Sequence, residues 1–345
     1  MRGIGRIPMY DISEMAFICR DYFADPDSAL ALVTLVEKEG TSYRQPGARM
    51  LVKRDGSVTG TISGGCLEGD LATLASRLFK EGRSEALECV DTRPVFGCHG
   101  TITLFVELVA PRRDVFHHWM KAMAQAIEQR HPITLRTVYR GNSETLGTTL
   151  IDGPGLKPKD DGNFIQPFGL HKRVVVIGAH GDARPVLQLI LSLGWQAIQV
   201  VPGSQRRGWI GNEDSGIRVE YHTPEEIAKA IPADRGTAVV VMTHNMGRDV
   251  GYAYVLLREA YPYVGMLGSQ KRRDEVFEHL LASGEADVTE TMERLHCPIG
   301  LDIGSETQSE IALSIVSEIK SVFSGCEGGK LKDKHTSIHP LVEIL

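Results

Sequence analysis

The sequence predicts an α/β protein: an N-terminal α+β domain followed by a doubly wound parallel sheet. In the second half, apolar strands alternate with amphipathic helices, which is typical of a parallel sheet covered on both faces. The first half instead contains a hairpin, an alternating strand and a glycine-rich loop that holds a cysteine. A chain of 345 residues is long enough for two such domains.

Composition excludes several classes of partner. Apolar residues make up 42% of the chain and charged residues 24%, an ordinary globular balance. A net charge of −6 offers no general attraction to nucleic acid, and no stretch approaches the roughly 18–20 apolar residues of a transmembrane helix. Residues 1–21 lack the apolar segment of a signal peptide, and the six cysteines form no CxxC pair. We therefore expect a cytoplasmic protein with reduced thiols that binds neither nucleic acid nor membrane.

The first half begins with a predicted helix over 26–39. Asp25 can cap this helix, Pro26 suits its first turn and Gly40 ends it. A hairpin is expected next, with Asp55-Gly56 at its turn. The further elements expected from periodicity are hairpin strands over 49–53 and 58–62, a helix over 67–78, strands over 86–90 and 101–109, a helix over 114–129, and strands over 133–139 and 148–151.

The second half alternates strand and helix. The predicted elements are strands over 173–177, 196–201, 237–242 and 263–267, helices over 183–193 and 249–260, and a last helix opened by the capping box Thr307-Gln308-Ser309-Glu310. These elements predict four segments: an N-terminal domain over 1–155 with a middle region from about 111, a Gly- and Pro-rich linker over 156–170, a C-terminal domain over 171–325, and a polar tail over 326–345.

The most informative local motif is Ser63-Gly64-Gly65-Cys66, placed between a strand and a helix. The first amides of a helix lack partners and carry partial positive charge, so Gly64 and Gly65 would let an anionic group approach them closely. The same charge favours the thiolate of Cys66, a nucleophile and metal ligand. The alternative is a tight turn that buries a structural cysteine. A second loop, Gly97-Cys98-His99-Gly100, offers either another metal-seeking thiol or a buried one.

These loops carry a family resemblance. The run from Arg44 to Val52, then Asp55-Gly56, then Gly60 to Asp70 closely resembles the N-terminal signature of the xanthine dehydrogenase accessory factor (XdhC/CoxI-like) family. The Cys98 loop is similar to that family's second cysteine loop, usually Cys-Gly-Gly, although His99 replaces a glycine here. In the second half, the resemblance is strongest over Pro298–Gly304.

The resemblance implies a protein that receives the molybdenum cofactor, as molybdopterin or its cytosine dinucleotide form, assists its sulfuration and delivers it to a molybdenum hydroxylase apoenzyme. A cysteine desulfurase is the sulfur donor that the family implies. Cys66 and Cys98 would then meet the metal, and Ser63 and the loop glycines, Gly100 included, would lie at the cofactor. Arg44 and Arg49 either pair with its phosphate or are solvated surface charges. We also expect a homodimer, since a labile cofactor has to be enclosed between small domains.

The second half contains a degenerate dinucleotide fingerprint and is Rossmann-like. Gly178 keeps the first glycine position after a strand, but His180 occupies the second, and only Gly181 offers a shifted substitute. The next strand ends in Val201-Pro202-Gly203, without an acid to bind a ribose hydroxyl. Both departures weaken the case for NAD(P) as a cofactor.

Two further loops follow strands of this sheet at the end where open α/β sheets bind ligands. Thr243 and His244 form the first, and Gly268 and Ser269 form the second, just before Lys271-Arg272-Arg273. Cations in the first turn of a helix oppose its dipole, so a bound phosphate would explain them; solvent exposure is the alternative.

Three functions remain open at this point. The favoured one is a cofactor-handling accessory protein, more plausibly a chaperone than an enzyme. The second is an NAD(P)-dependent oxidoreductase with His244 as its proton-transfer residue. The third is an interaction module that has lost small-molecule binding.

Overall fold

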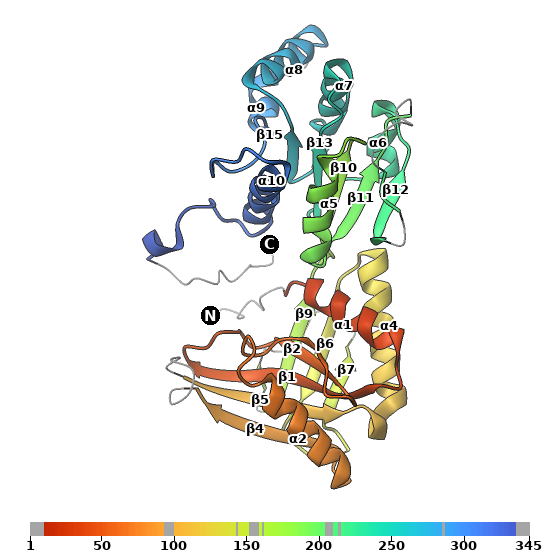
Figure 1. Ribbon diagram of the computed structural model, residues 1–345, viewed down its shortest axis with the longest axis vertical. Helices are drawn as coiled ribbons and strands as arrows, with labels where there is room; N and C mark the ends of the chain where they lie inside the picture. The colour runs from red at the N-terminus through yellow and green to blue at the C-terminus, as the bar shows by residue number, and fades with distance from the viewer. Residues whose placement is uncertain are drawn as a thin grey trace, which may run out of the picture. The chain divides into compact units, whose positions relative to one another are not determined.

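The protein is described by a computed structural model over residues 10–92, 100–142, 144–151, 159–160, 162–203, 210–212, 215–284 and 287–335 (Figure 1). The chain divides into two compact units between His171 and Lys172. No helix within the described ranges is both long enough and apolar enough to cross a membrane.

The first unit is built on an antiparallel five-stranded sheet with the order β3-β2-β1-β5-β4. The elements up to this point are α1 (Ser13–Ala24), β1 (Ala29–Gly40), β2 (Arg49–Lys53), β3 (Val58–Gly60), α2 (Glu68–Lys80), β4 (Glu85–Asp91) and β5 (Gly100–Leu108). The predicted hairpin and the predicted helix from Leu67 are thus confirmed, with ends shifted by one or two residues.

The predicted helix over 26–39 is wrong, because this segment forms β1, the central strand of the sheet. Its first eight residues are buried, with Val33 and Leu35 facing α2, and Leu32 facing α1. A strand buried on both faces is a continuous apolar run, which periodicity cannot distinguish from a buried helix. The β-branched residues Val33 and Thr34 favour the strand.

A second, four-stranded sheet completes the first unit, in the order β7-β6-β9-β8. Its elements, with the preceding helices, are η1 (Ala110–Arg112), α4 (Arg113–Gln129), β6 (Ile133–Val138), β7 (Gly147–Leu150), β8 (Lys159–Asp160) and β9 (Asn163–Phe168). The predicted linker over 156–170 is therefore wrong in its second half, since β9 pairs with β6 along its whole length.

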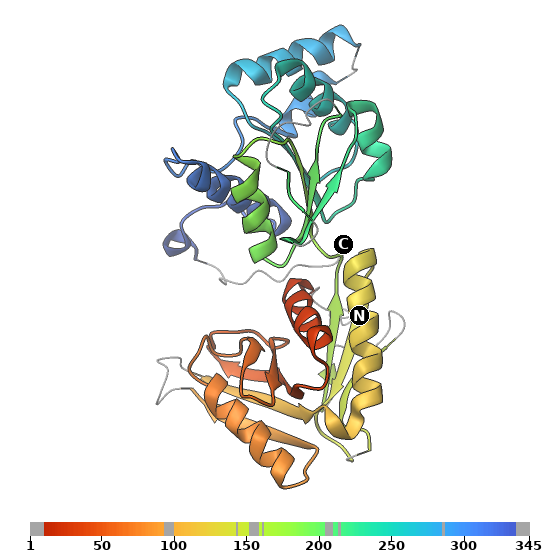
Figure 2. The same ribbon diagram turned by 45° about the vertical axis from the view of Figure 1, so that its right-hand side comes forward.

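The core of this unit lies on both faces of the five-stranded sheet. The orange helix α2 covers one face (Figure 2). The other face packs against α1, α4 and the second sheet through large side chains such as Trp119 and Phe168. The Cys66 loop leads into α2, which packs on the five-stranded sheet.

The second unit is a six-stranded parallel sheet with the order β12-β11-β10-β13-β14-β15, which is the Rossmann order. Its elements are β10 (Arg173–Ile177), α5 (Ala183–Ser192), β11 (Gln196–Val200), β12 (Ile217–Glu220), α6 (Pro224–Ala230), β13 (Thr237–Val241), α7 (Met246–Leu256), β14 (Tyr263–Met266), α8 (Gln270–Ala282), α9 (Val288–Glu293), β15 (Leu295–His296), α10 (Gln308–Phe323) and η3 (Leu331–Asp333). The predicted α/β class is confirmed.

Helices cover both faces of this sheet, as a doubly wound fold requires. Helices α5 and α10 bury one face, and α6, α7, α8 and α9 bury the other. The predicted capping box is present at α10, where the Thr307 hydroxyl accepts a hydrogen bond from the Glu310 amide. Because the strands are parallel, the loops after β10, β13 and β14 meet at one edge.

Candidate functional site

The loop between β3 and α2 is organised around one carboxylate, that of Glu68. Its oxygens accept hydrogen bonds from the amides of Ile62, Ser63, Gly65 and Leu67, at 2.8–3.1 Å. They also accept from the hydroxyls of Thr61 and Ser63, both at 2.7 Å. The Glu68 side chain is buried beneath the loop, where the residue is 8% exposed.

This carboxylate remains ionised in its buried place. Burial raises the pKa of Glu68, but the hydrogen bonds from Ser63, Thr61 and Ile62 outweigh burial and hold the pKa well below its usual range. The expectation that the amides around Gly65 are free to receive a ligand anion is therefore wrong. Glu68 already satisfies the amides of Gly65 and Leu67, and the amide of Gly64 donates to the Thr61 hydroxyl at 3.0 Å.

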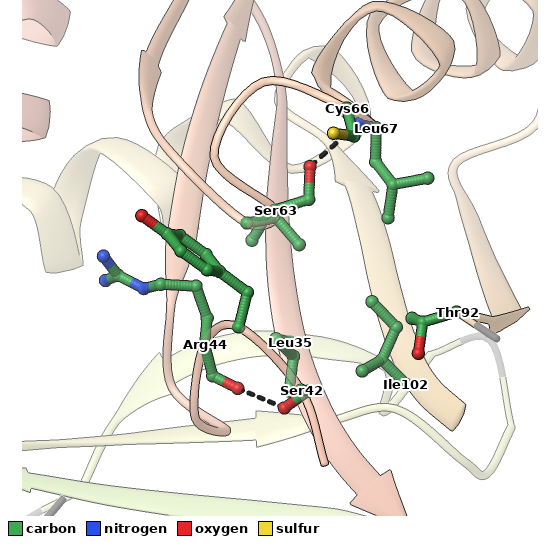
Figure 3. Close-up of a pocket in the computed structure, with 10 residues that line it drawn as sticks. Leu35, Ser42, Arg44, Ser63, Cys66, Leu67, Thr92 and Ile102 are labelled. Atoms are coloured by element: carbon green, nitrogen blue, oxygen red, sulfur yellow. Dashed lines mark hydrogen bonds between the residues drawn. The ribbon is translucent and has the colours of Figure 1, made fainter. Parts of the chain in front are cut away.

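Cys66 is exposed at the tip of this loop, so the alternative of a buried structural thiol is wrong. The sulfur borders a cavity of about 100 Å³ (Figure 3). The cavity is lined by Leu35, Ser42, Tyr43, Arg44, Ile62, Ser63, Cys66, Leu67, Thr92 and Ile102. Its walls thus come from β1, the β1–β2 loop, the Cys66 loop, the end of β4 and the start of β5.

Arg44 and Tyr43 form the wall that the β1–β2 loop contributes. Arg44 forms an ion pair with Glu14 of α1, and its side chain keeps 26% exposure. Tyr43 is 64% exposed, and its ring lies 3.0 Å from where a Cβ on Gly64 would stand. Tyr43 and Arg44 therefore line the same cavity as Cys66, with the Arg44 guanidinium engaged by Glu14.

Arg49 lies elsewhere. Its side chain is 2% exposed, donates to Gln166 of β9 and to the Thr137 hydroxyl at 3.2 Å, and so links the two sheets. Burial lowers the pKa of Arg49 to about 10, against the opposing influence of the Glu107 carboxylate. Neither predicted role holds: Arg49 is not a solvated charge, and it does not line the cavity.

Of the second cysteine loop, only Gly100 lies within the described residues. Cys98 lies outside the described residues. Gly100, the first residue of β5, is packed so tightly that a Cβ would lie 2.4 Å from the carbonyl oxygens of Glu39 and Thr41. Its carbonyl accepts from the Thr92 hydroxyl at 2.7 Å, and Thr92 lines the cavity.

The fingerprint loop of the second unit follows β10. Gly178 adopts a φ of +155°, and a Cβ there would lie 2.4 Å from the Met242 carbonyl oxygen, so only glycine fits. Gly181 is exposed before α5, with nothing within 4 Å of an added Cβ. The position that requires glycine is thus Gly178, which lets β10 and the loop after β13 approach closely.

The loop after β13 brings His244 to the same edge. His244 adopts a φ of +56°, and its Nε2 lies 2.6 Å from Oδ2 of Asp182. The rings of His244 and His180 meet edge to face at 4.8 Å. The preceding Thr243 is fully buried, and its amide and hydroxyl both donate to the buried carboxylate of Asp249.

The third loop, Gly268-Ser269, leads into α8, where Ser269 is the N-cap residue. The cations that follow are not a free phosphate-binding set. Arg272 pairs with the fully buried Asp249 and packs its side chain where a Cβ on Gly268 would stand. Lys271 is exposed, whereas Arg272 and Arg273 are half-buried.

Sequence reasoning missed the acidic residues that organise the Cys66 loop and the loops at the carboxyl end of the parallel sheet. Glu68 follows Gly65 by three residues, the spacing with which a capping-box glutamate reaches back to an amide, and this signal could have been used. No sequence pattern indicated the roles of Asp182 and Asp249. Asp182 pairs with His244, 62 residues away, and Asp249 binds Thr243 and Arg272 inside a buried turn. Among the described residues, no group of three or more His, Cys, Asp or Glu side chains could hold a metal ion.

The arrangement defines a two-unit protein that joins an exposed-cysteine loop to a Rossmann domain. The sequence matches the XdhC and CoxI family over residues 24–91 and the XdhC Rossmann domain over residues 174–319. The chain therefore belongs to the XdhC and CoxI family.

Two similar proteins match over most of their length, and one solved structure shares the fold. A Bacillus subtilis protein described as a probable xanthine dehydrogenase subunit is 27% identical over 87% of this chain and 94% of its own. The molybdenum cofactor insertion chaperone PaoD of Escherichia coli is 27% identical over 84% of this chain and 82% of its own. A crystal structure described as a xanthine dehydrogenase from Bacillus halodurans superposes with a TM-score of 0.70 at 21% identity, covering 94% of this chain and 98% of the other, which shows the shared fold.

Proposed function

We propose that this protein binds the molybdenum cofactor as cargo and delivers it to a molybdenum hydroxylase apoenzyme. The observation that carries the proposal is the exposed Cys66 sulfur at the edge of a cavity that also holds Arg44. Two relatives support it: one is described as a chaperone that inserts this cofactor, and the other as a probable component of xanthine dehydrogenase.

The residues present fit one end of such a cargo. Molybdenum is thiophilic, and a thiolate is a soft ligand that suits it. The cavity of about 100 Å³ is smaller than the roughly 300–1,000 Å³ of sites that enclose a whole small molecule. It therefore suits the metal-bearing end, with the pterin and its phosphate or nucleotide extending outward. Arg44, whose guanidinium is paired with Glu14, is the cation among the residues that line the cavity.

The proposal includes the finer features that the family resemblance implies. These are assistance in sulfuration of the metal with sulfur from a cysteine desulfurase, a homodimer, a cytoplasmic location, and a role for Cys98 beside Cys66. An oxidoreductase role gains no support. A side chain, His180, stands where the fingerprint needs glycine, and the Asp182 carboxylate lies beside the helix entrance that would receive a pyrophosphate.

The test is cofactor retention. The protein is purified from cells that make the cofactor, and its pterin and molybdenum are assayed together. Wild type should retain both in equal amounts, and Cys66→Ala should lose most of them. Cys89→Ala is the matched control, since Cys89 is also exposed but lies on β4 away from the lining of the cavity. Equal retention in all three proteins, or in none, would contradict the proposal.

A further inference from the structure

The Cys66 loop contains its own anion. Four amides and two hydroxyls converge on the Glu68 carboxylate, which is the arrangement by which proteins bind a phosphate or sulfate. Here the anion is a side chain of the same segment. The loop is thus a preformed anion nest that the chain fills itself.

The two glycines give the loop this shape. Gly64 and Gly65 adopt φ values of +79° and +118°, which turn successive amides inward and which other residues rarely adopt. The Ser63 hydroxyl adds a further bond by accepting from the Leu67 amide at 2.8 Å. The glycines therefore orient loop amides toward the Glu68 carboxylate, and not toward a ligand.

We propose that Glu68 is a positioning residue: its carboxylate fixes the loop so that Cys66 is presented outward, and it bars any anionic group of the cargo from the loop amides. The first part follows from the bonds on both sides of Cys66, to Gly65 and to Leu67. The second follows because a phosphate at the same amides would meet a like charge with the donors already engaged. The importance of this positioning for cofactor binding rests on the proposed function.

The direct test replaces Glu68 by Ala and measures amide hydrogen exchange in the full-length protein. Exchange at Ile62, Ser63 and Gly65 should rise by at least about tenfold, because each of these amides loses its acceptor. Leu67 should change less, because its amide keeps the Ser63 hydroxyl as an acceptor at 2.8 Å. Asp70→Ala is the matched control, since it removes an exposed acid from the same turn of α2 and should leave these four rates unchanged.

Chemical rescue separates a specific anion from general loop damage. Formate or inorganic phosphate, added at millimolar concentration, should bind the vacated nest in Glu68→Ala, shift these amide resonances and slow their exchange again. The same ions should leave the wild-type resonances unshifted. If Glu68→Ala folds poorly, Glu68→Gln, which keeps the volume but exchanges an acceptor for a donor, should still raise exchange at several of the four amides.

Either of two results would overturn the anion role of Glu68: unchanged exchange in both Glu68 variants, or phosphate binding to the wild-type loop with the same shifts. The cargo is tested separately, by cofactor retention, which should fall at least about fivefold in Glu68→Ala and recover with formate. If hydrogen exchange and anion rescue follow these expectations but the wild-type protein carries no cofactor, the proposed function is refuted and the anion role of Glu68 stands. Retention unchanged in Glu68→Ala would overturn the positioning role.

Discussion

Replacing Arg49 by Met tests whether this arginine supports the fold or binds a ligand. Arg49 is buried between the two sheets, where it donates to Gln166 and Thr137 and faces the buried Glu107. Removing it takes a donor away from Gln166 and Thr137 and leaves Glu107 with Arg112 as its remaining nearby cation. Breaking a buried charge pair costs about 3–5 kcal/mol. Relief of the arginine's own burial offsets part of this cost, so we expect a loss of about 3 kcal/mol.

The loss should depend on pH. Burial raises the pKa of Glu107 above its ordinary value, while hydrogen bonds from Thr148 and the charge of Arg49 oppose this. An acid whose pKa is higher in the folded state than in the unfolded state destabilises the fold at pH values above its unfolded-state pKa. Losing Arg49 raises the pKa of Glu107 in the folded state further, because a nearby positive charge is removed. Arg49→Met should therefore be more destabilising at pH 8 than at pH 5.

The assay is the free energy of opening from hydrogen exchange of amides in β1 and β5, which belong to the first unit alone. Arg83→Met is the control, since its exposed pair with Glu81 at 4.0 Å should contribute less than about 1 kcal/mol. The double variant Arg49→Met with Glu107→Gln should recover at least half of the loss, because both buried charges are removed. Unchanged opening in Arg49→Met, with cofactor lost, would refute this reasoning and identify a ligand-binding arginine.

Two further predictions concern the second unit. Gly178→Ala should lower the free energy of unfolding of this unit by at least about 2 kcal/mol, because the new Cβ would lie 2.4 Å from the Met242 carbonyl oxygen. The control Gly181→Ala should change the free energy of unfolding by less than about 0.5 kcal/mol, because nothing lies within 4 Å of its new Cβ. Equal effects of the two substitutions on thermal unfolding would contradict this geometry. Burial raises the pKa of Glu318, but hydrogen bonds from His296, Tyr263 and Gly300 hold it below its ordinary value. Stability from Glu318 should thus be present above about pH 4.5 and lost as pH falls, and an acid titration of Glu318→Gln that remains as steep as wild type would refute this.

The second unit could be predicted well from sequence because its strands are parallel and its helices amphipathic. The strand at Arg173–Ile177 was predicted at the bounds that the structure shows, and Gly178 was placed at the first glycine position of a degenerate fingerprint. That this position requires glycine follows from the structure, where a Cβ would lie 2.4 Å from the Met242 carbonyl oxygen. What could not be predicted is the pairing of His244 with Asp182, since that contact joins loops 62 residues apart.

The first unit was harder for two physical reasons. A second sheet covers the face of β2 that carries Arg49 and Leu51, and nothing in a single hairpin reveals such a cover. For the same reason β1, buried on both faces, has the pattern of a buried helix. The Cys66 loop was correctly placed between a strand and a helix, but the sequence left open whether its cysteine is exposed or buried. The acceptor of the loop amides was assigned to a ligand, whereas it is the carboxylate of Glu68.

The central claim is that the Cys66 sulfur meets the metal of the bound cofactor. X-ray absorption at the molybdenum edge of the loaded protein tests it most directly, with wild type compared with Cys66→Ser loaded by added cofactor. We predict one sulfur neighbour fewer around molybdenum in the variant. Identical sulfur coordination in the two loaded proteins would contradict the claim.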